Sequence, residues 1–318
     1  MRRIANLALA CLAFGAGAAL AQDYPAKPVK ILAPFAPGAT GDLTMRLAAE
    51  HFEKQWKQSF IVENRAGAGG LLGANEAKKA PADGYTLLAG IDNFTTFSVF
   101  VKDNTFDLQK DFAPISMLAR FPLVMLTNTE SGGKSVAEFI AAAKANPGKL
   151  NFGIIPNTPS HLFAILFMNR TGVQLELVGY QAAVALTQAL VAGQVQATAS
   201  VYGSFAPHIK AGKVAAVGIA GPSKLKIDPS VPLMTDQKLP ITMTVWYALF
   251  APAGTPQPVI QKLAAASAEW AKQQAVVERL DKLGIEAVGS TPAELAKAVA
   301  DDTRDRTEAA RLGKIQPQ

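Results

Sequence analysis

The sequence predicts an α/β fold with two lobes, each built on a mainly parallel sheet flanked by helices. Short β-branched runs alternate with amphipathic helix patterns along the whole chain. Residues 22–318 exceed what one hydrophobic core usually serves, which favours two lobes. Two long extended runs, near 117–127 and 240–250, have no strong turn signal and indicate where the chain passes between the lobes.

If the chain passes from one lobe to the other in both runs, residues 22–120 and 245–318 form the first lobe and residues 121–244 form the second. A chain that crosses twice leaves two lobes hinged on the crossing strands. The sequence therefore predicts a clamp with a ligand cleft and a hinge between its lobes.

Local signals define the elements of the first lobe. The run VKILAPF precedes a helix from about residue 42 to 57, SFIVEN precedes GGLLGANEAKKA, and YTLLAGI follows the turn Asp83-Gly84. Near the C-terminus, Thr291 and Glu294 have the spacing of a capping box and predict the start of the last helix.

The second lobe continues the alternation. Ser135 and Glu138 fit a capping box that opens the helix KSVAEFIAAAKANPGK, and the stop signal at 146–148, Asn-Pro-Gly, ends it. Further strand and helix patterns follow in the order LNFGII, SHLFAILFMNRTG, LELVGY, AVALTQALVAGQ, VQATASVYG and VAAVGIAG. This order is typical of strand–helix–strand units.

The first 21 residues have the pattern of a cleavable signal peptide. Arg2 and Arg3 precede an apolar stretch that ends in ALA at 19–21, an A-x-A cleavage signal. A membrane anchor is a weaker interpretation, because the stretch is short for a span of about 20 strongly apolar residues. A lipid-modified Cys11 is weaker still. We expect the mature protein to begin near Gln22.

Cysteine content and charge exclude several classes of protein. Cys11, the only cysteine, lies inside the signal, so disulfides, thiol catalysis and cysteine metal sites are excluded for the mature chain. The formal net charge of +6 comes from Lys and Arg scattered among Asp and Glu. This pattern is typical of a solvated surface, and we expect no nucleic-acid partner.

Motif spacing argues against nucleotide binding and hydrolysis. GATG at 38–41 lacks the Lys-Ser/Thr of a P-loop, and GAGGLLG at 67–73 has Leu72 where a dinucleotide loop needs glycine. The three histidines form no zinc motif, and no G-x-S-x-G turn is present. We expect no catalytic residue, no metal and no cofactor.

Four strand-to-helix junctions are rich in small or hydroxyl residues: 35–42, 66–73, 156–161 and 179–183. Ligands of parallel sheets collect at the carboxyl ends of strands. Two such junctions in each lobe would face each other across the cleft and offer the unpaired N–H groups of helix starts. Together they favour a pocket for a small anion held by N–H groups and water.

Five separated segments have a distinctive sequence: YPAKPVKILAPFAPGATGD, VENRAGAGGLLGANEAKKAPADGYTLLAG, VGYQAAVALTQALVAGQV, PHIKAGKVAAVGIAG and FAPAGTPQPVIQKL. In this order they resemble the Bug proteins, the extracytoplasmic receptors of tripartite tricarboxylate transporters. The resemblance covers essentially the whole mature chain. It implies a two-lobe periplasmic binding protein fold in which a ligand carboxylate lies between the first two loops, partly through ordered water.

The resemblance also implies which residues contact the ligand. The first loop supplies Phe35, Pro37, Gly38, Ala39, Thr40 and Asp42, and the second supplies Ala68, Gly69 and Gly70. Independently of the resemblance, the loops that follow offer further groups, and we expect these residues to complete the set: Asn93, Thr158, Ser160, His161, Tyr180, Gln181 and Ala182. Since Asp42 would repel an anion, we expect it to accept backbone N–H bonds or to organise a water.

We interpret the chain as a monomeric periplasmic receptor. It would capture a small organic carboxylate by lobe closure and deliver it to the large and small membrane subunits of a tripartite tricarboxylate transporter. A periplasmic enzyme that uses the same cleft and a ligand-dependent partner of a sensor kinase are the alternatives. Because the second-lobe loops offer no Lys or Arg, we favour a ligand with one anchored carboxylate and a neutral, polar or aromatic remainder.

Overall fold

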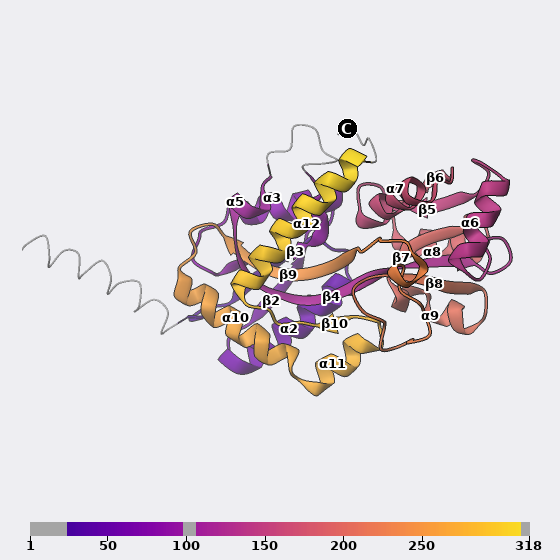
Figure 1. Ribbon diagram of the computed structural model, residues 1–318. Coiled ribbons are helices and arrows are strands. Elements are labelled where there is room, and N and C mark those ends of the chain that lie inside the picture. The colour runs from indigo at the N-terminus through magenta and orange to yellow at the C-terminus, as the bar shows by residue number, and fades with distance from the viewer. Residues whose placement is uncertain (1–23, 98–105, 313–318) are drawn as a thin grey trace, which may run out of the picture.

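The computed structural model describes residues 24–97 and 106–312. The predicted signal peptide, with Cys11, lies outside the described residues. The chain forms two lobes side by side, and strand β4 (Phe112–Asn128) runs through both (Figure 1). The first lobe contains the early and late parts of the chain, and the second contains the middle part.

The first lobe is built on a mixed sheet with the strand order β2-β1-β3-β9-β4. Its strands are β1 (Val29–Ala33), β2 (Phe60–Asn64), β3 (Thr86–Ile91), β9 (Thr244–Pro252) and β10 (Glu286–Ala287), which pairs with β4. Its helices are α2 (Thr40–Trp56), η1 (Ala68–Gly70), α3 (Leu71–Lys78), η2 (Asp92–Thr95), α5 (Leu108–Asp111), α10 (Gln257–Ala271), α11 (Gln274–Asp281) and α12 (Pro292–Leu312).

The second lobe has its own sheet, in which β4 pairs with β7 and β8, and β5 pairs with β6 and β7. Its strands are β5 (Asn151–Ile154), β6 (Glu176–Gly179), β7 (Ala197–Ser200) and β8 (Val214–Ala220). Its helices are α6 (Val136–Ala145), α7 (Pro159–Thr171), α8 (Ala183–Val191), α9 (Tyr202–Lys210) and η3 (Thr235–Gln237).

Both sheets hold more antiparallel pairing than strand–helix alternation predicts. Strand β1 is parallel to β2 and β3, and β5 is parallel to β6 and β7. In contrast, β9 is antiparallel to β3 and β4, and β4 is antiparallel to β7 and β8. The reason is that β4 leaves the first lobe and β9 returns to it, so the two crossing strands run in opposite directions.

The two crossings lie side by side. Strand β4 pairs with β9 as far as Pro122 and with β8 from Leu123 onward. The Leu123 N–H donates to the Met243 carbonyl (3.0 Å), and the Met243 N–H donates to the Ala220 carbonyl (2.9 Å). The residue before β9 is therefore still paired within the second lobe, and the chain changes lobe as β9 begins.

The predicted helix boundaries follow from local hydrogen bonds. The Ser135 hydroxyl accepts from the Glu138 N–H (3.1 Å), and α6 ends at Ala145, directly before the Asn-Pro-Gly stop signal. Thr291 and Glu294 exchange backbone-to-side-chain bonds of 2.8 and 3.2 Å in front of α12. The capping box at Thr291 is confirmed, whereas at Ser135 the hydroxyl caps the helix and the Glu138 carboxylate accepts from the Lys134 N–H (2.8 Å) instead.

Separate hydrophobic clusters stabilise the lobes. The first-lobe cluster surrounds β1, β3 and β9 and contains the fully buried Phe52 and Trp270. The second lobe has two clusters, one of which holds Phe139 and Phe163 and the other Phe205. The first of these two also includes Ala309 of α12, so the last helix packs against both lobes.

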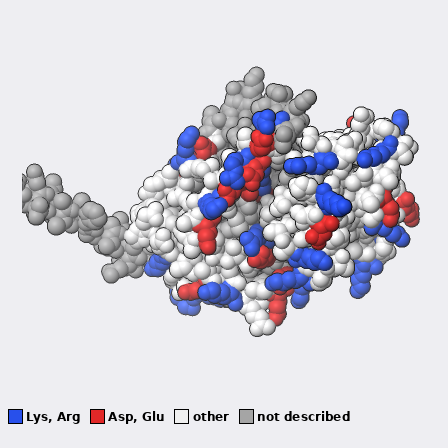
Figure 2. Space-filling view, in the orientation of Figure 1, with Lys and Arg blue, Asp and Glu red and all other residues white. Residues whose placement is uncertain are grey.

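Surface charges are intermixed. On the face drawn in Figure 2, Lys and Arg lie next to Asp and Glu along α12 and near the crossing strands. Ion pairs of α12 such as Lys297–Asp301 and Arg304–Asp301 account for part of this pattern. In the described ranges, no helix combines the length and the apolar character that membrane crossing requires.

Candidate ligand-binding cleft

A cavity of about 240 Å³ lies between the lobes at the crossing strands. Both lobes and both crossing strands line it, at the carboxyl ends of β3, β5 and β7 and at the start of α8. Its lining is Phe35, Ile91, Asp92, Asn93, Phe121, Leu123, Ile155, Thr158, Pro159, Ser160, Ala183, Leu186, Ala199, Ser200, Val201, Val245 and Tyr247. This is the edge at which parallel sheets collect ligands.

A second cavity, of about 340 Å³, shares Phe121 with the first. Four of its five charged side chains form ion pairs with one another: Arg120 Nε lies 2.8 Å from Glu286, and Lys226 Nζ lies 3.3 Å from Asp281, while Lys224 is the fifth. None of the four predicted junctions contributes to its lining. We therefore take the smaller cavity as the candidate ligand site.

The first loop, between β1 and α2, is organised by Asp42. The carboxylate accepts from the Gly38 N–H (2.9 Å), from Asn64 Nδ2 (2.8 Å) and from Arg46 Nε (3.0 Å). Burial disfavours its ionised form, but the bonds from Arg46, Asn64 and Gly38 outweigh that effect and lower the Asp42 pKa. Asp42 thus supports the loop, as expected, and lies outside the cavity lining.

Of the residues in the loop between β1 and α2, only Phe35 lines the cavity. Pro37, Gly38, Ala39 and Thr40 lie in the same loop and first helical turn but not along the cavity.

In the second loop, glycine is required by the backbone. Gly69 and Gly70 have φ values of 65° and 106°, which disfavour side chains. A Cβ at Gly70 would lie 2.9 Å from the Phe94 ring and 3.2 Å from Pro34. The structural explanation therefore accounts for both glycines, and together with Ala68 they lie outside the cavity lining.

The second-lobe loop before α7 closes on itself through its hydroxyl groups. The Thr158 hydroxyl donates to the Ile155 carbonyl (2.8 Å) and lies 3.0 Å from the Ser160 hydroxyl, which accepts from the Ile155 N–H (3.0 Å). His161 Nδ1 accepts from the Asn157 N–H (3.4 Å), and burial lowers the pKa of the imidazole. Thr158 and Ser160 line the cavity, and His161 does not.

Of the junction between β6 and α8, only the last residue lines the cavity. Ala183 lines the cavity, whereas the expected Tyr180, Gln181 and Ala182 do not. The Tyr180 ring packs against a second-lobe cluster, and Gln181 and Ala182 are exposed.

Aromatic rings form one side of the cavity. Tyr247 of β9 lies 5.3 Å from Phe35 and 5.5 Å from Phe121 of β4, measured between ring centroids. Burial, with a smaller effect of Asp92, raises the Tyr247 pKa, so its hydroxyl stays protonated as a hydrogen-bond donor. We did not expect Tyr247 from the sequence, because the extended run at 240–250 indicated a crossing and not which of its side chains face a cavity.

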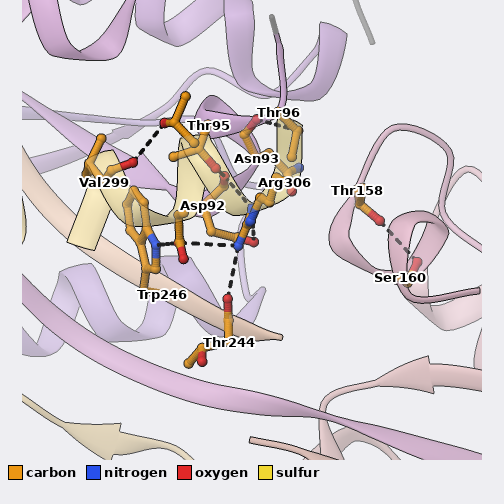
Figure 3. Close-up of polar contacts among 12 residues, drawn as sticks. Asp92, Asn93, Thr95, Thr96, Thr158, Ser160, Thr244, Trp246, Val299 and Arg306 are labelled. Atoms are coloured by element: carbon orange, nitrogen blue, oxygen red, sulfur yellow. Dashed lines mark hydrogen bonds and ion pairs between the residues drawn. The ribbon is translucent and has the colours of Figure 1, made fainter. Parts of the chain in front are cut away.

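A buried charge cluster, which we define as Asp92, Asp302 and Arg306, reaches the cavity lining at Asp92. Arg306 Nη1 donates to the Asp92 carbonyl (2.7 Å) and lies 3.0 Å from Asp92 Oδ2 (Figure 3). Its Nη2 donates to the Thr244 carbonyl (3.0 Å) and, at 3.4 Å, to Asp302. The guanidinium thus joins η2, β9 and α12.

Burial favours the protonated forms of the two carboxylates in this cluster. It raises the Asp92 pKa to about 6 despite the opposing effect of Arg306. It also raises the Asp302 pKa, although Trp246 Nε1 donates to Asp302 at 2.6 Å. Asp302 and Arg306 stand four residues apart on one helix, which predicts an ion pair but not its burial.

The family comparison identifies the protein class. The model of the tripartite tricarboxylate transporter family receptor matches residues 44–311. The chain belongs to this receptor family. BugT of Bordetella pertussis is 31% identical over 286 residues, covering 89% of this chain and 88% of BugT. The family consists of transport receptors, so the alternative of a periplasmic enzyme is set aside.

Solved structures from R. palustris have the same periplasmic binding protein fold. One, determined with adipate, has a TM-score of 0.85 and 26% identity, covering 93% of this receptor and 100% of that chain. MatC, with bound malate, has a TM-score of 0.80 and 28% identity, covering 90% of this receptor and 100% of MatC. Relatives of this receptor therefore bind carboxylates.

Proposed function

We propose that this receptor captures a small organic carboxylate in the cavity between its lobes and delivers it to the large and small membrane subunits of a tripartite tricarboxylate transporter. The observation that carries the proposal is the cavity at the carboxyl ends of β3, β5 and β7. The adipate and malate bound by relatives support the ligand class. The mature protein would begin near residue 22, in the periplasm.

The cavity favours a ligand with few charges. In the part of the chain that the structure describes, its lining includes no Lys, Arg or His, and Asp92 is its one carboxylate. A second ligand carboxylate placed there would lose hydration without gaining a charged partner. The rings of Phe35, Phe121 and Tyr247 suit an apolar or aromatic remainder instead.

The size of the cavity sets a further limit. About 240 Å³ is below the ~300–1,000 Å³ of pockets for drug-sized ligands. We propose that one carboxylate is held by N–H and hydroxyl donors, and that the remainder of the ligand packs on the aromatic rings.

Lobe closure would act through the two crossings. We propose that residues 22–120 with 245–318 and residues 121–244 move as two units, with hinges near 117–127 and 240–250. The side-by-side crossings at Leu123 and Met243 support this, because both crossing strands change lobe at the same place, about which the two units can rotate.

A thermal-shift panel tests the ligand class at equal ionic strength, with benzoate, adipate, malate and citrate as probes. A ligand at about 100 times its dissociation constant adds roughly 2.7 kcal/mol of stability. We expect benzoate, the monocarboxylate, to raise the melting temperature more than adipate, malate or citrate does. A shift with the di- or tricarboxylates only would contradict the single-carboxylate proposal, and mass spectrometry of ligand released from denatured protein would then identify the natural ligand.

A further inference from the structure

The cluster of Asp92, Asp302 and Arg306 contains two carboxylates but one guanidinium. Side-chain exposure is 4% for Asp92 and 5% for Arg306, so water contributes little screening there. With both acids ionised, the cluster carries one net negative charge at the edge of the cavity. This is unfavourable for a receptor whose ligand is an anion.

The two carboxylates differ in how well their ionised forms are stabilised. Asp302 has a side-chain exposure of 28% and accepts the Trp246 N–H at 2.6 Å in addition to its contact with Arg306. The Asp92 side chain has Arg306 as its one ion-pair partner among the described residues. Asp92 is also the member of the cluster that lines the cavity.

We propose that Asp92 takes up a proton when a carboxylate ligand enters the cavity, so that ligand capture by this receptor is coupled to proton uptake. The inference rests on the proposed function, because it requires an anionic ligand. A neutral Asp92 leaves the Arg306 charge balanced by Asp302 alone, and the negative charge next to the ligand disappears. An anion in the cavity favours the same change, since a nearby like charge raises the pKa of a carboxyl group.

The groups that face Asp92 are consistent with this assignment. Arg306 and Asp302 face it from α12, and Tyr247 faces it from β9. Tyr247 stays protonated and therefore adds no charge. With a pKa of about 6, the Asp92 side chain is mostly ionised at pH 7 and able to accept a proton on binding.

Calorimetric titration with benzoate, adipate or malate at pH 7 and pH 8 tests the coupling, because all three probes are fully ionised there. Each titration is run in two buffers of different ionisation enthalpy, which gives the number of protons taken up. We expect net proton uptake at pH 7, and a dissociation constant that rises by up to about tenfold per pH unit.

Two variants separate the roles of the carboxylates. In Asp92→Asn, the neutral side chain mimics the protonated acid, so proton uptake should vanish and binding at pH 8 should be tighter than in the wild type. The matched control is Asp42→Asn, which removes an equally exposed carboxylate from the neighbouring loop. Whatever its affinity, this control should retain the proton uptake of the wild type.

The outcomes distinguish the two proposals. Binding of a probe without proton uptake, or uptake that persists in Asp92→Asn, would overturn the coupling and leave the proposed function intact. If benzoate, adipate, malate and citrate all fail to bind at either pH, the proposed function fails, and this inference fails with it.

Discussion

Asp42 and Asp92 follow neighbouring parallel strands of the first lobe, and the exposed fraction of each side chain is 4%. Their pKa values nevertheless shift in opposite directions, downward for Asp42 and upward for Asp92. Asp42 accepts from three groups, and its partner Arg46 is 51% exposed. Asp92 shares Arg306, itself 5% exposed, with a second carboxylate. A small exposed fraction therefore does not fix the charge of a carboxylate by itself: burial outweighs the one shared guanidinium at Asp92, whereas three donors outweigh burial at Asp42.

The largest expected effect is the difference in stability loss between replacing Arg306, the partner of Asp92, and replacing Arg46, the partner of Asp42. Arg306→Met leaves Asp92 buried without its ion-pair partner and should lower the free energy of unfolding at pH 8 by about 3–5 kcal/mol. Arg46→Met should lower the free energy of unfolding by about 1 kcal/mol or less, because the Arg46 side chain is half exposed and Asp42 keeps two other donors. Denaturant unfolding at pH 8 measures both. Equal losses for the two variants would show that the Asp42–Arg46 and Asp92–Arg306 ion pairs contribute equally to stability.

The second prediction uses the sign of the Asp92 shift. Because its pKa is raised from 3.8 to about 6 on folding, Asp92 contributes stability below pH 4 that is lost as the pH rises through 6. The free energy of unfolding of the wild type should therefore fall relative to Asp92→Asn between pH 4 and pH 8, by about 3 kcal/mol at most. Unfolding of the ligand-free proteins across this range measures the difference. Parallel pH profiles would rule out a titrating Asp92.

For Asp42 the sign is reversed. Its lowered pKa means that its contribution is present at neutral pH and is lost as the pH falls through the folded-state value. Asp42→Ala should lower stability at pH 7 by about 2 kcal/mol, because the Gly38 N–H and Asn64 lose their acceptor. It should weaken carboxylate binding as well, since the loop that carries Phe35 loosens. Lost binding with unchanged stability would contradict the supporting role.

The smallest expected effect concerns Tyr247, which lines the cavity together with Asp92. Tyr247→Phe removes one hydroxyl and should weaken carboxylate binding about tenfold if that hydroxyl donates to the ligand. The control is Tyr202→Phe, because the Tyr202 hydroxyl already donates to Asp228 (2.9 Å) and lies outside the cavity lining. Calorimetry with benzoate or adipate compares the two. Equal affinities would mean that Tyr247 contributes only its ring.

Much of the fold could be predicted because its signals are local. The helix caps at Ser135 and Thr291 depend on residues three positions apart, and they start helices as expected. The site was predictable only in part. The structure lines the cavity with Phe35, Asn93 and the Thr158–Ser160 loop, which stand at strand ends, but it keeps Gly70 and Tyr180 in the packing behind them. Small residues in a loop indicate a tight turn whether or not a ligand lies beside it.

The sequence by itself determined the alternation of strands and helices, the long extended runs near 117–127 and 240–250, and the resemblance to solute receptors, since each depends on contiguous residues. Only the tertiary structure decided the charge pattern of the cleft. Arg306 stands 214 positions after Asp92, and no spacing rule connects them. Arg306 contacts Asp92 only because α12 packs over the start of β9. Since these side chains are buried, an excess of one carboxylate over the guanidinium is poorly screened by water there. The electrostatics of the site is therefore a property of the packed lobes and not of any one motif.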